Sequence, residues 1–97
     1  MPRPELLTEQ ERVLELKLNP DWISDGVSIT RELVASNFVA AVGIVNSIAV
    51  LAETLDHHPD ILLYGWNKIR VVTSTHDKGG LTKLDFELAK KIDDLNF

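Results

Sequence analysis

Residues 22–33 read WISDGVSITREL and carry the clearest sign of a β-hairpin in the chain. Asp25-Gly26 separates two runs of β-prone residues there, and glycine accepts the positive φ angle that a tight turn requires. A second pair of strands is predicted over 61–64 and 68–74, on either side of a turn at Gly65. The later run alternates charged and apolar side chains over much of its length, as a half-buried strand does. The sequence thus predicts two hairpins.

Three helical segments surround these hairpins. The first opens with the capping-box pattern TEQE at 8–11, and the second is expected from about Phe38 to Leu55. The third starts near Thr82, and its apolar side chains recur at three- and four-residue spacing: Leu84, Leu88, Ile92 and Leu95. This order predicts one α+β domain over residues 1–97, a four-stranded antiparallel sheet with three helices packed on one face, in the order α-β-β-α-β-β-α.

Composition excludes several classes of protein. A chain of 97 residues has room for one core, and its 44% hydrophobic and 26% charged content is typical of a globular protein rather than a disordered one. The net charge of −5 argues against a dedicated nucleic-acid binder, which is usually basic. The absence of cysteine excludes thiol catalysis and thiolate zinc sites, and it fits a reducing compartment.

Residues 33–52 contain no charged side chain and are long enough to span a membrane. Polar residues interrupt the stretch, and Glu32 and Glu53 flank it, where a spanning helix would favour Lys or Arg on its cytoplasmic side. We therefore predict no membrane span but a helix buried on two sides, by its own sheet and by a partner subunit. The N-terminus lacks a signal-peptide pattern, so the expected location is cytoplasmic.

The chain has three histidines, and all fall within twenty residues. His57 and His58 follow the second predicted helix, and His76 follows the last predicted strand. If those strands form a hairpin, the start of one and the end of the other meet at the same edge of the sheet. Three imidazoles would converge there beside carboxylates of Glu53, Asp56 and Asp77, an arrangement suited to proton transfer near neutral pH.

A metal site is the alternative for this cluster. The usual zinc patterns, a histidine pair at i and i+4 or a set of Cys and His ligands, are absent. Asp56 or Asp60 could still supply a carboxylate ligand, so a metal-dependent hydrolase stays open as a second function. For any one histidine alone, a hydrogen-bonded loop residue is the simpler interpretation. Three histidines together with acidic neighbours favour proton chemistry.

A fixed spacing joins these residues into a longer pattern. Glu53 is followed after three intervening residues by His57-His58-Pro59, and after six more by Trp66. His76 follows Trp66 after nine intervening residues, and Asp85 follows His76 after eight. This pattern resembles the signature of the pterin-4a-carbinolamine dehydratases, and the α+β order agrees with the fold of that family. The resemblance covers roughly Trp22 to the C-terminus. Further matching positions are Trp22, Ala52, Thr75, Gly80, Leu81 and Thr82.

The resemblance implies a hydro-lyase that acts on a reduced pterin carrying a hydroxyl on a ring-fusion carbon. Aromatic amino acid hydroxylases leave this 4a-hydroxytetrahydropterin behind, and loss of water gives the quinonoid dihydropterin in tetrahydrobiopterin recycling. One proton goes to the departing hydroxyl, and another is withdrawn from the neighbouring ring nitrogen. No cofactor, metal or nucleotide is expected. Histidines typically contribute a factor of about 10²–10⁴ to such acid–base steps.

By position, His57 and His76 resemble the family's acid/base pair, and His58 resembles a residue that binds and orients the pterin. Glu53 is similar to a helix-end glutamate that fixes an imidazole tautomer or raises its pKa. The expected catalytic set is therefore His57, His76, His58 and Glu53. The stretches that would line the pterin pocket supply Asp56, His57, His58, Ser74, Thr75, His76 and Asp77.

Other positions in the pattern have structural interpretations. Asp85 stands three residues after Thr82, a capping-box relation, so we expect it to cap the last helix rather than take part in catalysis. Trp22 and Trp66 are interpreted as packing residues.

The resemblance also implies a homodimer or homotetramer, assembled through the sheet edge and the helix around Phe38–Leu55. The chain departs from the family around the second strand and the start of that helix, where members commonly carry several phenylalanines and only Phe38 is present here. Gly43 also lies near the middle of the helix. The alternative function is a non-catalytic protein on the same scaffold, since some members act as dimerisation cofactors and others assist assembly. No direct binding of nucleic acid is expected.

Overall fold

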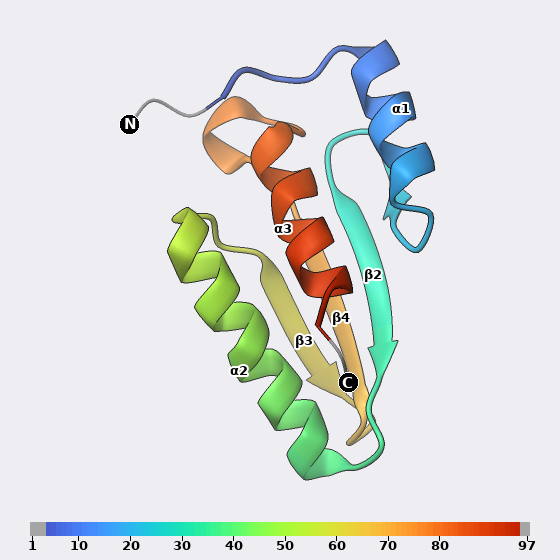
Figure 1. Cartoon of the computed structure of the whole chain (residues 1–97), viewed down its shortest axis with the longest axis vertical. Coiled ribbons are helices and arrows are strands. Elements are labelled where there is room, and N and C mark those ends of the chain that lie inside the picture. The colour runs from blue at the N-terminus through green and yellow to red at the C-terminus, as the bar shows by residue number, and fades with distance from the viewer. Residues whose placement is uncertain (1–3, 96–97) are drawn as a thin grey trace.

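The structure is a computed structural model and describes residues 4–95. Its elements follow the predicted order, with a short 3-10 turn added before the last helix (Figure 1). They are α1 (Glu9–Leu18), β1 (Ile23–Ser24), β2 (Ile29–Val34), α2 (Phe38–Leu55), β3 (Asp60–Tyr64), β4 (Lys68–Thr73), η1 (His76–Lys78) and α3 (Lys83–Asp93). The predicted fold class, with three helices and a four-stranded antiparallel sheet, is confirmed.

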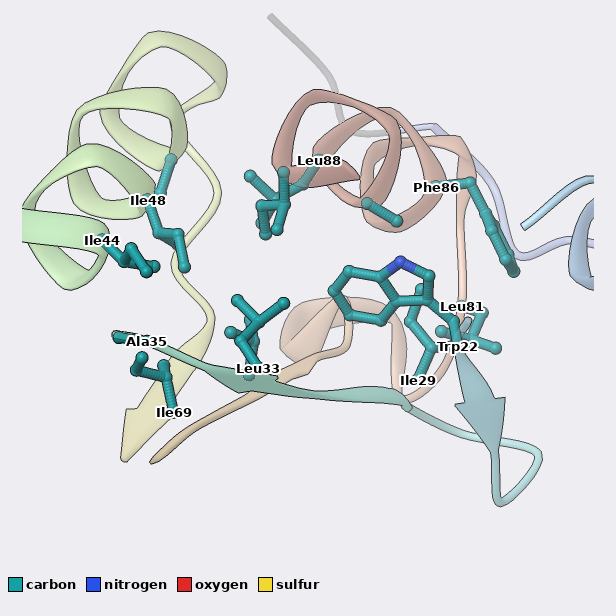
Figure 2. Close-up of a cluster of buried hydrophobic side chains, with 14 of the residues drawn as sticks. Trp22, Ile29, Leu33, Ala35, Ile44, Ile48, Ile69, Leu81, Phe86 and Leu88 are labelled. Atoms are coloured by element: carbon teal, nitrogen blue, oxygen red, sulfur yellow. The ribbon is translucent and has the colours of Figure 1, made fainter. Parts of the chain in front are cut away.

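The sheet has the strand order β1-β2-β4-β3, and every pairing is antiparallel. The last strand in sequence, β4, therefore lies between β2 and β3. Figure 2 shows α2 and α3 on the same face of this sheet, with the apolar core between the two layers. Because β4 is an inner strand, the segment that follows it, which contains η1, begins between the ends of β2 and β3 and not at a side edge of the sheet.

Alternate residues of β4 face the helices and are buried, as the period of a strand requires. On β2 the residues at the same face are Ile29 and Leu33, which are buried, and Arg31, which is half-buried (Figure 2). The core members from these strands and from the helices include Ile29, Leu33, Ile69, Val71, Ile44, Ile48, Phe86, Leu88 and Ile92. Trp22 is also buried, and its indole N–H donates to the Asp93 carboxylate at 3.0 Å. The prediction that Trp22 packs in the core is confirmed.

The first hairpin is present but shorter than predicted. Only Ile23 and Ser24 pair with β2, because the loop extends from Asp25 to Ser28. The carboxylate of Asp25 accepts hydrogen bonds from the N–H groups of Val27 and Ser28 at 2.9 and 2.8 Å. These bonds satisfy loop amides that a strand would otherwise have paired.

Trp66 does not pack in the core, so that prediction is wrong. It lies in the turn between β3 and β4 with φ +59° and is 60% exposed. The preceding Gly65 also has a positive φ, of +54°. Two successive left-handed residues reverse the chain within a few positions, and the turn leaves the indole on the surface.

Helix α2 is buried on one side only. Ala41, Ile44, Ile48 and Ala52 face the core, whereas the outer side exposes apolar side chains: Phe38, Val39, Val42 and Val50. Within residues 4–95, α2 is the one helix whose length and mean hydropathy of 1.9 would allow it to cross a membrane, with 22% of that stretch buried. The prediction that this helix packs against the protein's own sheet is confirmed, and its burial by a partner subunit stays a prediction.

We predict that Gly43→Ala stabilises the protein by about 0.5–1 kcal/mol, because alanine has the higher helix propensity. A Cβ atom added at Gly43 would meet no other atom within 4 Å. Urea unfolding followed by circular dichroism measures the change. Gly26→Ala is the matched control: it also has open space, but its φ of +99° makes alanine strained there. Destabilisation by Gly43→Ala would contradict the prediction.

Candidate active site

The three histidines meet at one end of the sheet. In the β3–β4 hairpin Asp60 pairs with Val72, so the start of β3 and the end of β4 lie side by side. His57 and His58 precede β3, and His76 begins η1 just after β4. Together with Ser74 and Asp77, all three histidines line a pocket of about 330 Å³.

The end of α2 determines where each of the two adjacent histidines points. Asp56 caps the helix in the left-handed conformation, with φ +48°, and the His57 N–H donates back to the Ala52 carbonyl at 3.1 Å. A left-handed residue at this position reverses the chain direction, and aspartate tolerates it better than most residues do. His57 is consequently 3% exposed, while the next residue, His58, lies at the surface.

His57 is held by a buried carboxylate. Its Nε2 atom lies 2.6 Å from Oδ1 of Asp85, whose side chain is completely buried. Three further donors reach the same carboxylate: the hydroxyls of Thr73 and Thr75 at 2.8 and 2.9 Å, and the Thr82 N–H at 2.9 Å. The capping box between Thr82 and Asp85 that the sequence predicts is present. The same carboxylate also holds His57, a role that its position at a helix start did not reveal.

These hydrogen bonds determine the charge of Asp85. Burial alone would raise its pKa, but the hydrogen bonds from His57 and from the other three donors outweigh burial and hold the pKa of this carboxyl below its ordinary value of 3.8. Asp85 is therefore an anion at neutral pH, next to an imidazole that lines the pocket.

His58 and Glu53 form a second imidazole–carboxylate pair, at the surface. Their Nε2 and Oε1 atoms are 3.0 Å apart, and their side chains are 62% and 76% exposed. Water screens such a pair, so it orients the two side chains more than it stabilises the fold. Glu53 thus pairs with the exposed histidine rather than with the buried one.

The remaining wall of the pocket follows β4. The Ser74 hydroxyl donates to the Val27 carbonyl at 2.8 Å, which ties the first hairpin loop to the pocket. His76 and Asp77 are exposed on η1, which ends where Gly79 adopts φ +71°. An isolated antiparallel β-bridge between Thr75 and Gly80 joins the two ends of the loop that contains η1.

The predicted site residues separate into two groups. Five line the pocket: His57, His58, Ser74, His76 and Asp77. The others lie around it: Glu53 holds His58, Asp56 turns the chain, and Thr75 is buried beneath the pocket against Asp85. Among residues 4–95, no group of three or more His, Asp or Glu side chains lies close enough together to hold a metal ion.

Sequence reasoning missed two residues that support the site. Asp85 carried a signal, since it occurs in the spaced pattern, but the capping-box interpretation was sufficient to explain it. Thr73 carried none, because a threonine near the end of a half-buried strand is ordinary. Its hydroxyl becomes notable only when the third dimension places it on Asp85.

The arrangement can transfer protons. A carboxylate that holds an imidazole fixes the orientation of the ring and stabilises the cation that forms when the ring accepts a proton. His76 lines the same pocket from a different element and can serve as the second proton-transfer group. One pocket is thus lined by imidazoles from two separate parts of the chain, an arrangement suited to acid and base steps on a single bound molecule.

Comparison with known proteins gives a consistent result. The family profile described as pterin 4 alpha carbinolamine dehydratase matches residues 5–95. A protein from Chloroflexus aurantiacus is 43% identical to this chain and covers 98% of it, and the match spans 98% of that protein. A protein from Sulfurisphaera tokodaii is also 43% identical, and the match spans 92% of this chain and 95% of that protein. Both relatives are provisionally named pterin-4-alpha-carbinolamine dehydratase.

Solved structures agree. A crystal structure of a transcriptional coactivator/pterin dehydratase from Brucella melitensis has a TM-score of 0.82 and 34% identity, covering 90% of this chain and 94% of that one. A pterin dehydratase-like protein, described as a RuBisCO assembly factor in the alpha-carboxysome, shares the fold alone, with a TM-score of 0.60, 14% identity and coverage of 74% and 82%. By profile, sequence identity and structure, the chain belongs to the pterin-4a-carbinolamine dehydratase family.

Proposed function

We propose that this protein is an active dehydratase that converts 4a-hydroxytetrahydropterin into quinonoid dihydropterin and water, in the cytoplasm, as part of tetrahydrobiopterin recycling. The observation that carries the proposal is the pocket lined by all three histidines, one of them held by the buried Asp85. A non-catalytic assembly or dimerisation protein on this scaffold has no need of a buried, fully hydrogen-bonded imidazole–carboxylate pair at a pocket wall.

The reaction balances with protons alone. The bond between the ring-fusion carbon and its hydroxyl breaks, and the oxygen leaves as water after it receives a proton. The neighbouring ring nitrogen loses its proton, and its electron pair forms the new carbon–nitrogen double bond. We assign His57 as the base, because Asp85 stabilises the imidazolium that forms, and His76 as the acid that protonates the hydroxyl.

The other pocket residues bind rather than react in this proposal. His58, oriented by Glu53, borders the pocket and would contact the heterocycle. Ser74 and Asp77 supply polar groups to the wall that could read the donor and acceptor edge of a pterin. A substrate held against two imidazoles reacts faster because the geometry is fixed before the proton moves.

We further propose that the protein is a homodimer or homotetramer whose subunits meet through the outer side of α2 and the sheet edge. Val39 is 80% and Val50 64% exposed, on a helix that contains no charged residue before Glu53. Several large apolar side chains exposed on one side of a helix are usually covered in soluble proteins.

The proposed activity is tested by adding the protein to freshly generated 4a-hydroxytetrahydropterin and following the loss of water by absorbance. We expect His76→Ala and His57→Asn each to lower kcat by about 10²–10⁴-fold, the usual contribution of an acid–base group. Lys91→Ala, on the exposed side of α3 and outside the pocket lining, is the control and should retain full rate. Wild-type protein no faster than buffer would favour the non-catalytic alternative.

Asp85→Asn should weaken both activity and stability. The amide keeps the shape but presents an NH₂ group to donors that need an acceptor, at a cost of about 1–3 kcal/mol. Because the pKa of Asp85 is lowered on folding, its stabilising contribution is present above the ordinary value of 3.8 and is lost as the pH falls through the lowered folded value. Urea unfolding therefore measures the free energy of unfolding of wild type and variant at pH 7 and in acid, and we expect the difference between the two proteins to be smaller in acid. A difference that does not change with pH would contradict an ionised Asp85.

Val39→Glu should reduce the oligomeric state by burying a charge in the proposed interface. Sedimentation velocity compares it with wild type and with Val13→Glu, in which the replaced valine is 48% exposed on α1. We expect a smaller species for Val39→Glu and the wild-type species for Val13→Glu. A monomeric wild type, or equal behaviour of the two variants, rules out the α2 interface.

A further inference from the structure

The carboxylate of Asp85 accepts four hydrogen bonds in an environment without access to water. Oδ1 accepts from His57 Nε2 and from the Thr73 hydroxyl, at 2.6 and 2.8 Å. Oδ2 accepts from the Thr75 hydroxyl and the Thr82 N–H, both at 2.9 Å. Thr73, Thr75 and Thr82 are each at most 1% exposed. The charge on Asp85 is thus solvated by the protein and not by the solvent.

The direction of these bonds follows from the donors available. The Leu84 N–H donates to the Thr82 hydroxyl oxygen at 3.2 Å. The Thr82 hydroxyl in turn can donate a hydrogen bond to the Thr75 oxygen, which lies 2.8 Å away. Thr75 then donates its hydrogen to Asp85. The amide hydrogen and the two hydroxyls form one relay of donors that ends on the carboxylate and favours its anionic form.

A proton between His57 and Asp85 has two possible positions. It can stay on Nε2 of the imidazole, which leaves Asp85 anionic, or it can move to Oδ1 and leave Asp85 neutral. Burial favours the neutral carboxyl, whereas every donor to Asp85 favours the anion. Thr73 donates to Oδ1, the same oxygen that faces His57. Its hydroxyl therefore bears most directly on where this proton resides.

We propose that Thr73 is a positioning residue for His57. By donating to Oδ1 it keeps Asp85 ionised, so that the hydrogen between the two side chains stays on Nε2 of the imidazole. Thr75 supports the same state through Oδ2. Without the Thr73 hydroxyl, the His57–Asp85 pair holds an additional proton to higher pH, and less of the proton-accepting form is present at neutral pH.

Other titratable groups lie near the pair, and Asp56 directly precedes His57 in the chain. His58, His76 and Asp77 line the same pocket as His57, and Glu53 is paired with His58. Within residues 4–95, the Thr73 side chain makes one hydrogen bond, the one to Asp85. Thr73→Val, which has almost the same shape, thus removes a single donor from the pair.

The test measures proton position directly and needs no substrate. Long-range ¹H–¹⁵N correlation spectra of labelled protein report the protonation of each imidazole nitrogen. The chain has three histidines, and the variants His58→Asn and His76→Asn assign the imidazole signals to individual residues. In Thr73→Val we expect the His57 titration to move to higher pH by about 0.5–1 unit, the size expected for one hydrogen bond to a charged group. Thr73→Ser, which restores the hydroxyl, should return to the wild-type titration.

Thr30→Val is the matched control, because Thr30 is a half-buried strand threonine on β2, opposite Val72. It should leave the His57 titration unchanged. If Thr73→Val does not fold, Thr73→Ala removes the same hydroxyl without placing a methyl group against the carboxylate. An unchanged His57 titration in the variant that lacks the hydroxyl, or an equal shift in Thr30→Val, overturns the proposal.

The consequence for turnover rests on the proposed dehydratase function. If that function holds, the acid limb of the kcat–pH profile should move with the His57 titration in Thr73→Val, while KM changes little. Because the spectra do not depend on turnover, the two failures are distinguishable. An inactive wild type with the expected spectral shift contradicts the function alone, and an active wild type without the shift contradicts the role of Thr73 alone.

Discussion

The buried charge of Asp85 is the constraint on which the site depends. A carboxylate removed from water is tolerated only where hydrogen bonds replace its hydration, and here the donors come from three parts of the chain. The segment after α2 supplies His57, the end of β4 and the residues after it supply Thr73 and Thr75, and the start of α3 supplies the Thr82 N–H. Satisfying one carboxylate therefore fixes the relative positions of three elements at the end of the sheet.

The same constraint separates the roles of two adjacent histidines. Asp56 in the left-handed conformation turns the chain, so that His57 points inward to Asp85 and His58 points outward to Glu53. The first of these imidazoles is almost fully buried, whereas the second is 62% exposed. In the proposed reaction the first suits proton transfer, which needs a defined geometry, and the second suits substrate binding.

Local chemistry made much of this structure predictable from the sequence. The capping box at Thr8 and the hydrogen bonds of Asp25 in the first hairpin loop depend on neighbours within a few residues. The alternation of β4 can be recognised directly in its sequence. The gathering of histidines at one edge followed from the hairpin geometry. Prediction failed at Trp66, which the left-handed conformation of its turn places on the surface, and at Thr73, whose hydroxyl gains its partner only through packing of α3 on the sheet.

We propose above all that the pocket at the end of β4 receives a pterin between His57 and His76. The most direct measurement is an NMR titration with a stable dihydropterin, following the imidazole and backbone signals. We expect saturable shifts of the three histidines and of Ser74 and Asp77, with α1 unaffected. Saturable shifts elsewhere on the surface, or none at all at millimolar pterin, would contradict it.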